Sequence, residues 1–387
     1  MNPDKVPALL SYAFRPFFLM NGIFAMLSIF LWVMTLHGSG LPGATPLWHS
    51  HEMLIGFAMA AVAGFSLTAV ANWTGRPAIK GTPLALLVVF WLAGRLAMLF
   101  SSSWLPASLV SFLDMLFPVL LCWLLSREII AGRSRRNYPL IAIVFLVAGL
   151  NAVYHLGAAL WLPGGDRLAI YLLIHTLVLL VTIIAGRIVP SFSGNWLRQQ
   201  GQTQMPVNND LVNKAALVLT VLVGLAASFM PMHLLTGVLA FGAAIIHGLR
   251  LGRWKGLATI SNPMLFVLHV SYLWLPVGYT LLGCAVFGWL FTPTAALHAL
   301  TMGAIGSMVL AVTTRVALGH TGRPLQAARL TVLAYWLLML AVLVRVLGPL
   351  SGQGYLMMID ISAMGWILAF AIFTWVYWPV LSRPRVD

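Results

Sequence analysis

The chain has 387 residues, of which 61% are hydrophobic and only 8% are charged. Soluble domains carry about 25% charged residues, so this composition excludes a soluble protein and indicates an integral membrane protein. The formal net charge is +14, but the basic residues are spread over many connections. That distribution indicates membrane topology and excludes a nucleic-acid-binding face.

Twelve apolar segments are long enough to cross a bilayer, which takes about 20 helical residues. The first six are expected at residues 17–37, 50–71, 83–101, 109–130, 138–161 and 168–190. The other six are expected at 212–230, 232–251, 260–282, 293–318, 324–347 and 356–379. We therefore expect an all-α membrane protein in which residues 1–387 form a single integral membrane domain of twelve transmembrane helices.

Lys and Arg residues alternate between the connections. They occur before the first segment, in every second connection and after the last segment, whereas the intervening connections contain a single base, Arg167, beside Asp166. Basic connections stay on the cytoplasmic side of a membrane. Both termini are therefore expected to be cytoplasmic.

Three histidines recur at almost equal intervals, since His51, His175 and His298 are separated by 124 and 123 residues. A fixed period indicates a repeated structural unit, here four helices long, with approximate boundaries at 14–137, 138–261 and 262–387. Residues 51–77 also align without gaps with residues 298–324, and both stretches end in Thr-Gly-Arg-Pro. In that tetrapeptide, glycine suits the positive φ that ends a helix, and proline cannot extend the helix. We expect a pseudo-threefold arrangement of four-helix units.

A group of polar residues is expected at one depth near the outer face, given a rise of about 1.5 Å per helical residue. The group comprises His49, His51, Glu52, Asp114, His155, His175, His298 and Asp360. Histidine is costly in hydrocarbon and is the commonest metal ligand, so we interpret the five histidines as metal ligands. The three acids are candidate catalytic residues. The alternatives are hydrogen-bonded packing histidines, and acids in ion pairs or helix-end caps.

His49 and His51 are about 200° apart around a helix, so both cannot point at one place if that segment is fully helical. One of them is therefore expected to serve the neighbouring connection or a second site.

Five motifs resemble the NnrS family of haem- and copper-containing membrane proteins linked to bacterial nitric oxide stress. They are Phe14-Arg15-Pro16-Phe17-Phe18, Trp48-His49-Ser50-His51-Glu52-Met53, Asn72-Trp73-Thr74-Gly75-Arg76-Pro77, Gly186-Arg187-Ile188-Val189-Pro190 with Asn195-Trp196, and Leu318-Gly319-His320-Thr321-Gly322-Arg323-Pro324. The resemblance extends over the whole chain. It implies b-type haem, copper, a bacterial inner membrane location and a protective role against nitric oxide.

Further polar residues lie towards the predicted inner side. His269 is expected to belong to a deeper ligand set or to serve as a second axial base of the haem, and His320 is a weaker candidate for the same inner site. Arg187 and Arg315 are expected to anchor haem propionates, because a bidentate contact to a carboxylate is favourable. The alternative is that both arginines extend to the inner interface.

The leading functional hypothesis is a haem- and copper-binding protein that handles nitric oxide, with redox turnover at the intramembrane histidine site. Nitric oxide is small, neutral and soluble in lipid, so such a site needs no polar entrance. Reduction would consume protons, and Glu52, Asp114 and Asp360 are candidates for the outer part of a relay. The sequence does not identify an electron donor. The alternatives are a proton or metal-ion transporter, and a haem or copper sensor or buffer without turnover.

Overall fold

The computed structural model describes residues 6–40, 43–101, 105–352 and 354–386. The regular elements in these ranges are helices. Twelve of the helices are long and apolar enough to cross a membrane. The predicted class, an all-α membrane protein with twelve transmembrane helices, is therefore confirmed.

The spanning helices lie close to the predicted segments. They are α1 (Phe14–Leu36), α2–η3–α3 (Pro46–Thr74), α4 (Thr82–Leu99), α5 (Ala107–Ala131), α6 (Tyr138–Ala158), α7 (Gly165–Gln199), α8 (Asp210–Phe229), α9 (Leu234–Gly252), α10 (Pro263–Val286), α11–η6–α12 (Pro293–His320), α13 (Arg329–Leu347) and α14 (Tyr355–Ser382). The largest difference is in α7, which continues through Pro190 to Gln199.

The chain divides into two compact units. Unit 1 comprises Met1–Leu173, Thr313–Pro324 and Phe370–Asp387, and unit 2 comprises Ile174–Val312 and Leu325–Ala369. Unit 1 therefore contains α1 to α6, unit 2 contains α8 to α11 with η6 and α13, and α7, α12 and α14 contribute to both.

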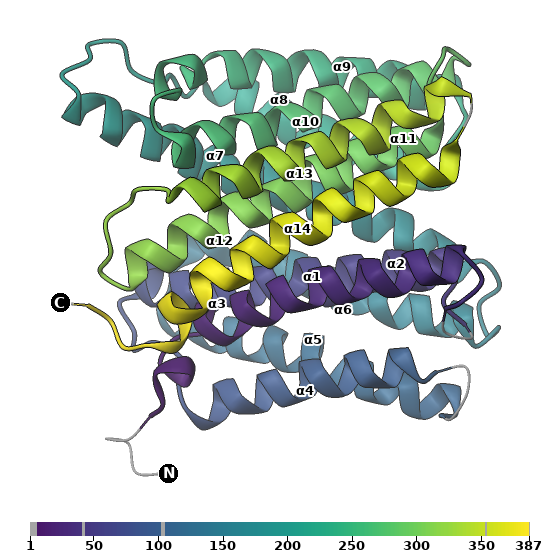
Figure 1. The fold of residues 1–387 in the computed structure, drawn as a ribbon, viewed down its shortest axis with the longest axis horizontal. Coiled ribbons are helices and arrows are strands. Elements are labelled where there is room, and N and C mark those ends of the chain that lie inside the picture. The colour runs from purple at the N-terminus through teal and green to yellow at the C-terminus, as the bar shows by residue number, and fades with distance from the viewer. Residues whose placement is uncertain (1–5, 41–42, 102–104, 353, 387) are drawn as a thin grey trace. The chain divides into compact units, whose positions relative to one another are not determined.

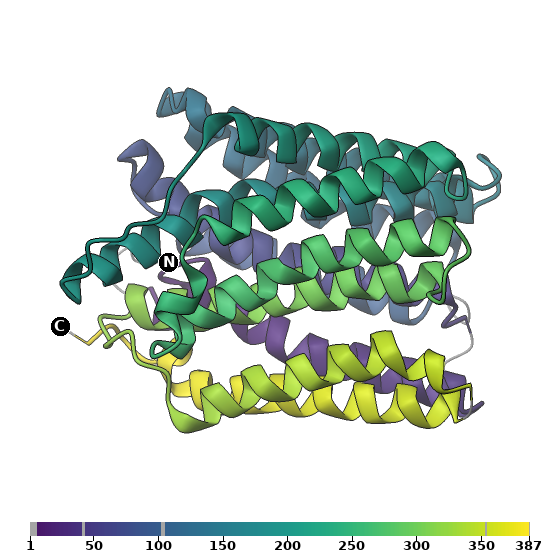
Figure 2. The same ribbon diagram turned by 90° about the horizontal axis from the view of Figure 1, so that it is seen from above.

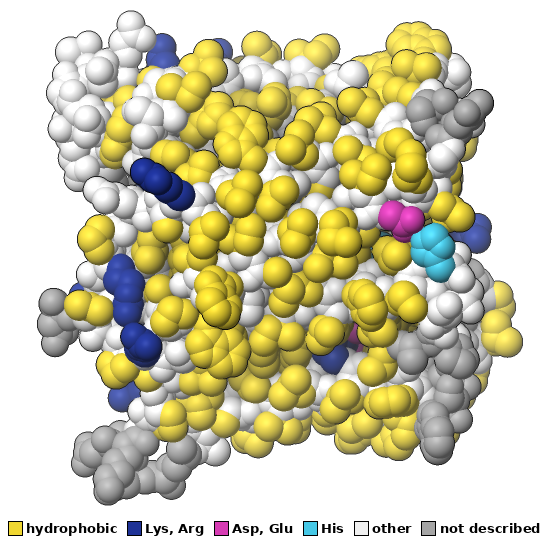
Figure 3. Space-filling view, viewed as in Figure 1, with side chains coloured by type: hydrophobic (Ala, Val, Ile, Leu, Met, Phe, Trp, Pro, Cys, Tyr) yellow, Lys and Arg dark blue, Asp and Glu magenta, His cyan; other side chains and the backbone are white. Residues whose placement is uncertain are grey.

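Neighbouring helices within each unit pack along their lengths. In unit 1, α4 packs on α5, α5 packs on α6 and α1 packs on α3 (Figure 1). In unit 2, α9 packs on both α8 and α10, and α10 packs on η6; these helices are the teal and green ribbons of Figure 2. Hydrophobic side chains cover most of the visible face in Figure 3, as lipid contact requires.

Two spanning helices change to π-helical geometry directly after a histidine. In the first, α2 (Pro46–His51) leads into η3 (Glu52–Ala58) and then α3 (Met59–Thr74); in the second, α11 (Pro293–His298) leads into η6 (Ala299–Gly306) and then α12 (Ser307–His320). The side chains of Thr45 and Thr292 cap the two starts, accepting from the N–H groups of Trp48 at 3.1 Å and Ala295 at 3.2 Å. The aligned stretches therefore share their helical elements. The division into three repeats remains a prediction.

Two of the motifs mark helix ends in unit 1. Gly75 and Gly322 have φ values of 68° and 76°, the left-handed conformation predicted for Thr-Gly-Arg-Pro.

A third motif contains Arg15, which is 2% exposed. Arg15 donates from Nη1 to the carbonyl oxygens of Leu381 at 2.9 Å and of Arg383. Arg15, in the motif Phe14-Arg15-Pro16-Phe17-Phe18, thus links the start of α1 to the end of α14 by hydrogen bonds.

Candidate metal centre

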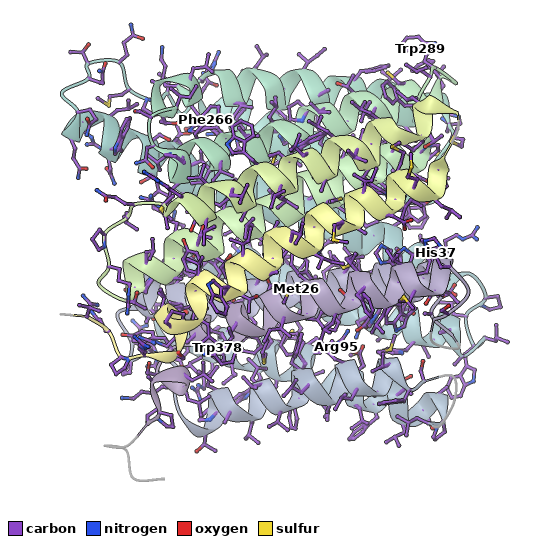
Figure 4. All side chains as sticks on the ribbon, viewed as in Figure 1. Met26, His37, Arg95, Phe266, Trp289 and Trp378 are labelled. Carbon is purple, nitrogen blue, oxygen red and sulfur yellow. The ribbon has the colours of Figure 1, made fainter. Side chains whose placement is uncertain are left out.

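Helices from four parts of unit 1 bring ionisable side chains together in its core. His51 ends α2 and Glu52 begins η3, and the other members come from α4, α5 and α6. We name this group the polar cluster; it consists of His51, Glu52, Arg95, Asp114, Asn151 and His155. No member is more than 7% exposed. Arg95 is labelled among the side chains of unit 1 in Figure 4.

Arg95 forms ion pairs with both acids of the polar cluster. Its Nη1 bonds to Glu52 Oε1 and its Nη2 bonds to Asp114 Oδ1. Two glycines make room for these contacts: a Cβ at Gly56 would lie 3.1 Å from Arg95 Nη1, and a Cβ at Gly94 would lie 3.0 Å from Asp114 Oδ1. Two carboxylates and one guanidinium leave one negative charge in this core when the histidines are neutral.

Both ring nitrogens of His51 face oxygen atoms. Nδ1 lies 2.9 Å from Glu52 Oε1, and Nε2 lies 2.8 Å from Asn151 Oδ1 and 3.3 Å from Asp114 Oδ2. The Asn151 amide is oriented by its own donation from Nδ2 to Asp114 Oδ2 at 2.7 Å. Since a neutral imidazole donates only once, this arrangement favours an additional positive charge beside Nε2, either a second ring proton or a cation. The Tyr154 ring stacks on His51 at 4.4 Å.

His155 completes a group that offers metal ligands. Its Nε2 lies 2.8 Å from Asp114 Oδ2, and the ligand atoms of His51, Asp114 and His155 all lie within 4.8 Å of one another. Atoms bound at about 2 Å to one ion lie roughly 3 to 3.5 Å apart, so only small side-chain shifts separate this geometry from a coordination shell. Two imidazoles and a carboxylate suit copper, zinc or iron.

The other predicted residues of unit 1 lie apart from this group. His49 turns to α1, where its ring stacks on Trp32 at 4.9 Å with an angle of 12° between the planes. His49 and His51 therefore point to different places, as the helical angle requires. The half-buried ring of His320 lies 5.7 Å from the ring of Phe14, and Arg315 is half-buried on α12.

Unit 2 contains a histidine with an unusual environment. His175 on α7 is 4% exposed, yet neither ring nitrogen has a hydrogen-bond partner among the described residues. Helix α8 passes close by at Gly224, where a Cβ would lie 2.8 Å from the Cβ of His175. A buried imidazole with two unused nitrogens is costly unless a ligand uses one of them.

The remaining predicted residues also belong to unit 2. His269 Nε2 lies 2.8 Å from Ser193 Oγ, while its Nδ1 has no partner in the described part of the chain. His298 is half-buried, and its Nδ1 lies 2.8 Å from the Thr294 carbonyl oxygen one turn earlier. Arg187 on α7 and Asp360 on α14 are half-buried.

Sequence reasoning placed four polar-cluster residues at one depth but missed the other two. Glu52 and Asp114 are in ion pairs, which was the alternative interpretation of these acids, and their partner Arg95 was not singled out. The sequence did contain a signal for Arg95, because this arginine lies inside the apolar segment 83–101 and the neighbouring apolar segments contain Glu52 and Asp114. The signal at Asn151 was an amide inside an apolar segment, where such side chains hydrogen-bond to neighbouring helices.

Residues 8–385 match the NnrS protein family. This chain belongs to the NnrS family. No curated protein matches it.

The NnrS match extends over almost the whole chain, so it includes the polar cluster and the helices of both units. It confirms the resemblance seen in the motifs. Membership of the NnrS family fits a membrane protein of the nitric oxide response, and His51, Asp114 and His155 form a buried group that could hold a metal ion.

Proposed function

We propose that this NnrS protein binds copper and b-type haem in the bacterial inner membrane and handles nitric oxide there, by redox turnover at the copper site. The observation that carries the proposal is the buried group of His51, Asp114 and His155, whose ligand atoms lie within 4.8 Å of one another. Copper is assigned to this group, and its imidazole and carboxylate donors suit that metal.

The charge and orientation of the polar cluster support a cation. One negative charge remains after Arg95 has paired with Glu52 and Asp114, and a metal ion would neutralise it where water cannot. Glu52 accepts from Nδ1 of His51, which presents Nε2 to the metal. Such carboxylate–histidine contacts orient the imidazole ligands of metal sites.

The surrounding residues have defined tasks in this proposal. Arg95 holds both carboxylates, Tyr154 covers one face of His51, and Asn151 donates to Asp114 Oδ2 at 2.7 Å and so orients that carboxylate. Copper and haem, when bound, supply one-electron chemistry and open coordination positions for a diatomic gas. Asp360 is retained as a proposed member of a proton relay in unit 2.

His175 would hold the haem iron in unit 2 through a ring nitrogen. It is buried and both of its ring nitrogens are unused among the described residues, and haem iron takes an imidazole nitrogen. His269 has one unused nitrogen and remains a candidate for a second axial position. His298 and His320 stay in the proposal as weaker ligands, with Arg187 and Arg315 as anchors for the haem carboxylates.

Elemental analysis of the purified full-length protein tests the copper assignment. The His51→Ala, Asp114→Asn and His155→Ala variants are expected to lose copper. The His49→Ala variant is the matched control, because His49 is two residues from His51 but stacks on Trp32. Unchanged copper content in the three cluster variants would remove the assignment.

The visible spectrum tests haem separately. The His175→Ala variant is expected to lose the Soret band after haem-replete expression, while the His49→Ala variant keeps it. A protein without any Soret band would exclude haem. Nitric oxide consumption in a single turnover then distinguishes an enzyme from a sensor or buffer, and ion flux in proteoliposomes distinguishes both from a transporter.

A further inference from the structure

Unit 2 contains a buried arginine that is held without a carboxylate. Arg250 on α9 is 5% exposed. Its Nε donates to Asn213 Oδ1 at 2.8 Å, and its Nη1 donates to the Thr182 carbonyl oxygen and to the Tyr272 hydroxyl, each at 2.9 Å. All three acceptors are neutral, and the other close groups are the rings of Trp254 and Tyr272, whose centroids lie 5.3 and 5.8 Å from Cζ. These contacts fix the guanidinium but supply no negative charge.

The acids of unit 2 do not supply a negative charge to balance Arg250. Asp210 and Asp360 are the only acids in its sequence, and Arg250 forms no ion pair among the described residues. Arg95 in unit 1 shows the contrast, because the same chain pairs that buried arginine with two carboxylates. An unpaired charge in a low-dielectric interior is unfavourable.

A chain of hydrogen bonds holds the guanidinium in one position. The Tyr272 hydroxyl accepts from Arg250 and lies 2.8 Å from His247 Nδ1, to which it can donate. His247 Nε2 in turn lies 3.0 Å from Thr220 Oγ1, which donates to the Ala216 carbonyl oxygen at 2.7 Å. Helices α7, α8, α9 and α10 therefore all contribute to a preorganised cationic site.

Two donors beside this site have no acceptor. Arg250 Nη2 makes no hydrogen bond among the described residues, and neither does the indole Nε1 of Trp254, which is 0% exposed. The Arg250 Cζ atom lies 5.3 Å from the centroid of the Trp254 ring, so the guanidinium and the indole are adjacent. Gly186 on α7 lets the guanidinium approach its backbone closely, because a Cβ there would overlap Nη2 and would lie 2.7 Å from Cζ.

We propose that Arg250 Nη2 and Trp254 Nε1 form a binding site for a carboxylate or another small planar oxyanion. Such an anion would neutralise the guanidinium and accept from both unused donors. Two sources have this chemistry: a carboxylate of the bound haem, which rests on the proposed function, and a free anion such as nitrite, which does not. In either case the site is distinct from the polar cluster of unit 1.

The test compares probes with and without the carboxylate. The full-length apoprotein is titrated with haem b and with haem b dimethyl ester, in which both carboxylates are esterified. In parallel, its unfolding temperature is measured with sodium nitrite and sodium acetate against sodium chloride at equal ionic strength. The Arg250→Gln variant removes the charge, and Arg253→Gln is the matched control, because Arg253 lies at the same helix end but is exposed.

A haem source predicts that the wild type binds haem b about 10- to 100-fold more tightly than the diester, in line with hydrogen bonds to a charged group. Arg250→Gln lowers that preference at least several-fold, and Arg253→Gln keeps it. A free-anion source predicts no such preference, but a higher unfolding temperature with nitrite or acetate that Arg250→Gln abolishes.

The proposal is overturned if the wild type shows neither effect, or if Arg250→Gln retains whichever effect the wild type shows. If Arg250→Gln does not fold, Trp254→Phe replaces it, since this variant removes the indole N–H and is expected to reduce the same effect. If no haem binds, the proposed function fails at haem, while the nitrite and acetate measurements still decide the anion site.

Discussion

At the scale of single residues, each buried acid in the described part of unit 1 is paired with an arginine. Arg95 pairs with Glu52 and Asp114, and the third buried acid, Glu128, bonds to Arg76 and Arg127, each at 2.6 Å. The chain has only eight acids, and three of them form buried ion pairs. These residues therefore hold the core together as well as offering a site.

Removing Arg95 is expected to destabilise the protein strongly. Arg95→Met leaves Glu52 and Asp114 buried without their partner, which costs about 3–5 kcal/mol when one member of a buried pair is removed. Combining it with Glu52→Gln and Asp114→Asn is expected to recover part of the loss. Unfolding temperatures in detergent provide the measurement, with the exposed Arg167 changed to Met as the control. If Arg95→Met unfolds at the wild-type temperature, the ion pairs are not structural.

The sequence allowed the polar cluster to be predicted in part. Depth along each helix follows from the helical rise, so His51, Glu52, Asp114 and His155 were expected at one level. The partner of each acid was not predictable, because depth does not tell which faces of the helices meet. Arg95 and Asn151 reach their places through the packing of α4 on α5 and of α5 on α6.

At the scale of helices, the π-helical segment η3 positions the polar cluster. It begins at Glu52 directly after His51, and its backbone receives two side-chain hydrogen bonds, from Trp91 to the Gly56 carbonyl oxygen at 3.1 Å and from Asn21 to that of Phe57 at 2.6 Å. Segments of this kind occur frequently at functional sites. The close approach of Arg95 depends on the missing side chain at Gly56.

A methyl group at Gly56 is therefore expected to damage the cluster. Gly56→Ala pushes against Arg95 Nη1 and the Phe24 ring, so it lowers both the unfolding temperature and the copper content. Gly149→Ala on α6 is the matched control, because a Cβ there has no neighbour within 4 Å; it is expected to stabilise by up to about 1 kcal/mol through helix propensity. If Gly56→Ala and Gly149→Ala have the same unfolding temperature and the same copper content, the role given to Gly56 is contradicted.

The helices themselves were largely predictable, since hydropathy and breakers located all twelve spans. The end of α7 was wrong by several residues, because Pro190 lies inside the helix, which continues into a polar stretch. The π-helical segments were not predicted. Their altered hydrogen-bond spacing leaves no mark on an apolar composition, even though both follow a histidine of the repeat.

At the scale of the whole molecule, the boundaries of the predicted sequence repeats do not coincide with those of the two compact units. The period predicts the order and depth of helices, whereas the units reflect which helices pack together. His51 and His155 belong to unit 1, while His175 and His298 belong to unit 2. Equal spacing along the chain therefore did not predict which histidines share a unit.

The predicted topology has a direct test. In a variant whose two cysteines, Cys122 and Cys284, are replaced by alanine, a new cysteine is placed at Arg135 or at Leu162, which are exposed on successive connections. A membrane-impermeant maleimide added to intact spheroplasts is expected to label the Leu162→Cys variant alone, since basic connections stay in the cytoplasm. Labelling of Arg135→Cys instead would invert the topology.

Pulsed electron paramagnetic resonance of the copper(II)-loaded, full-length protein tests the ligand set most directly. The proposed site predicts two imidazole nitrogens coupled to the copper in the wild type and in His49→Ala, whereas His51→Ala and His155→Ala are expected to lose this signal together with the copper. A wild-type spectrum without imidazole coupling, or one that His51→Ala and His155→Ala leave unchanged, would contradict copper binding at the polar cluster.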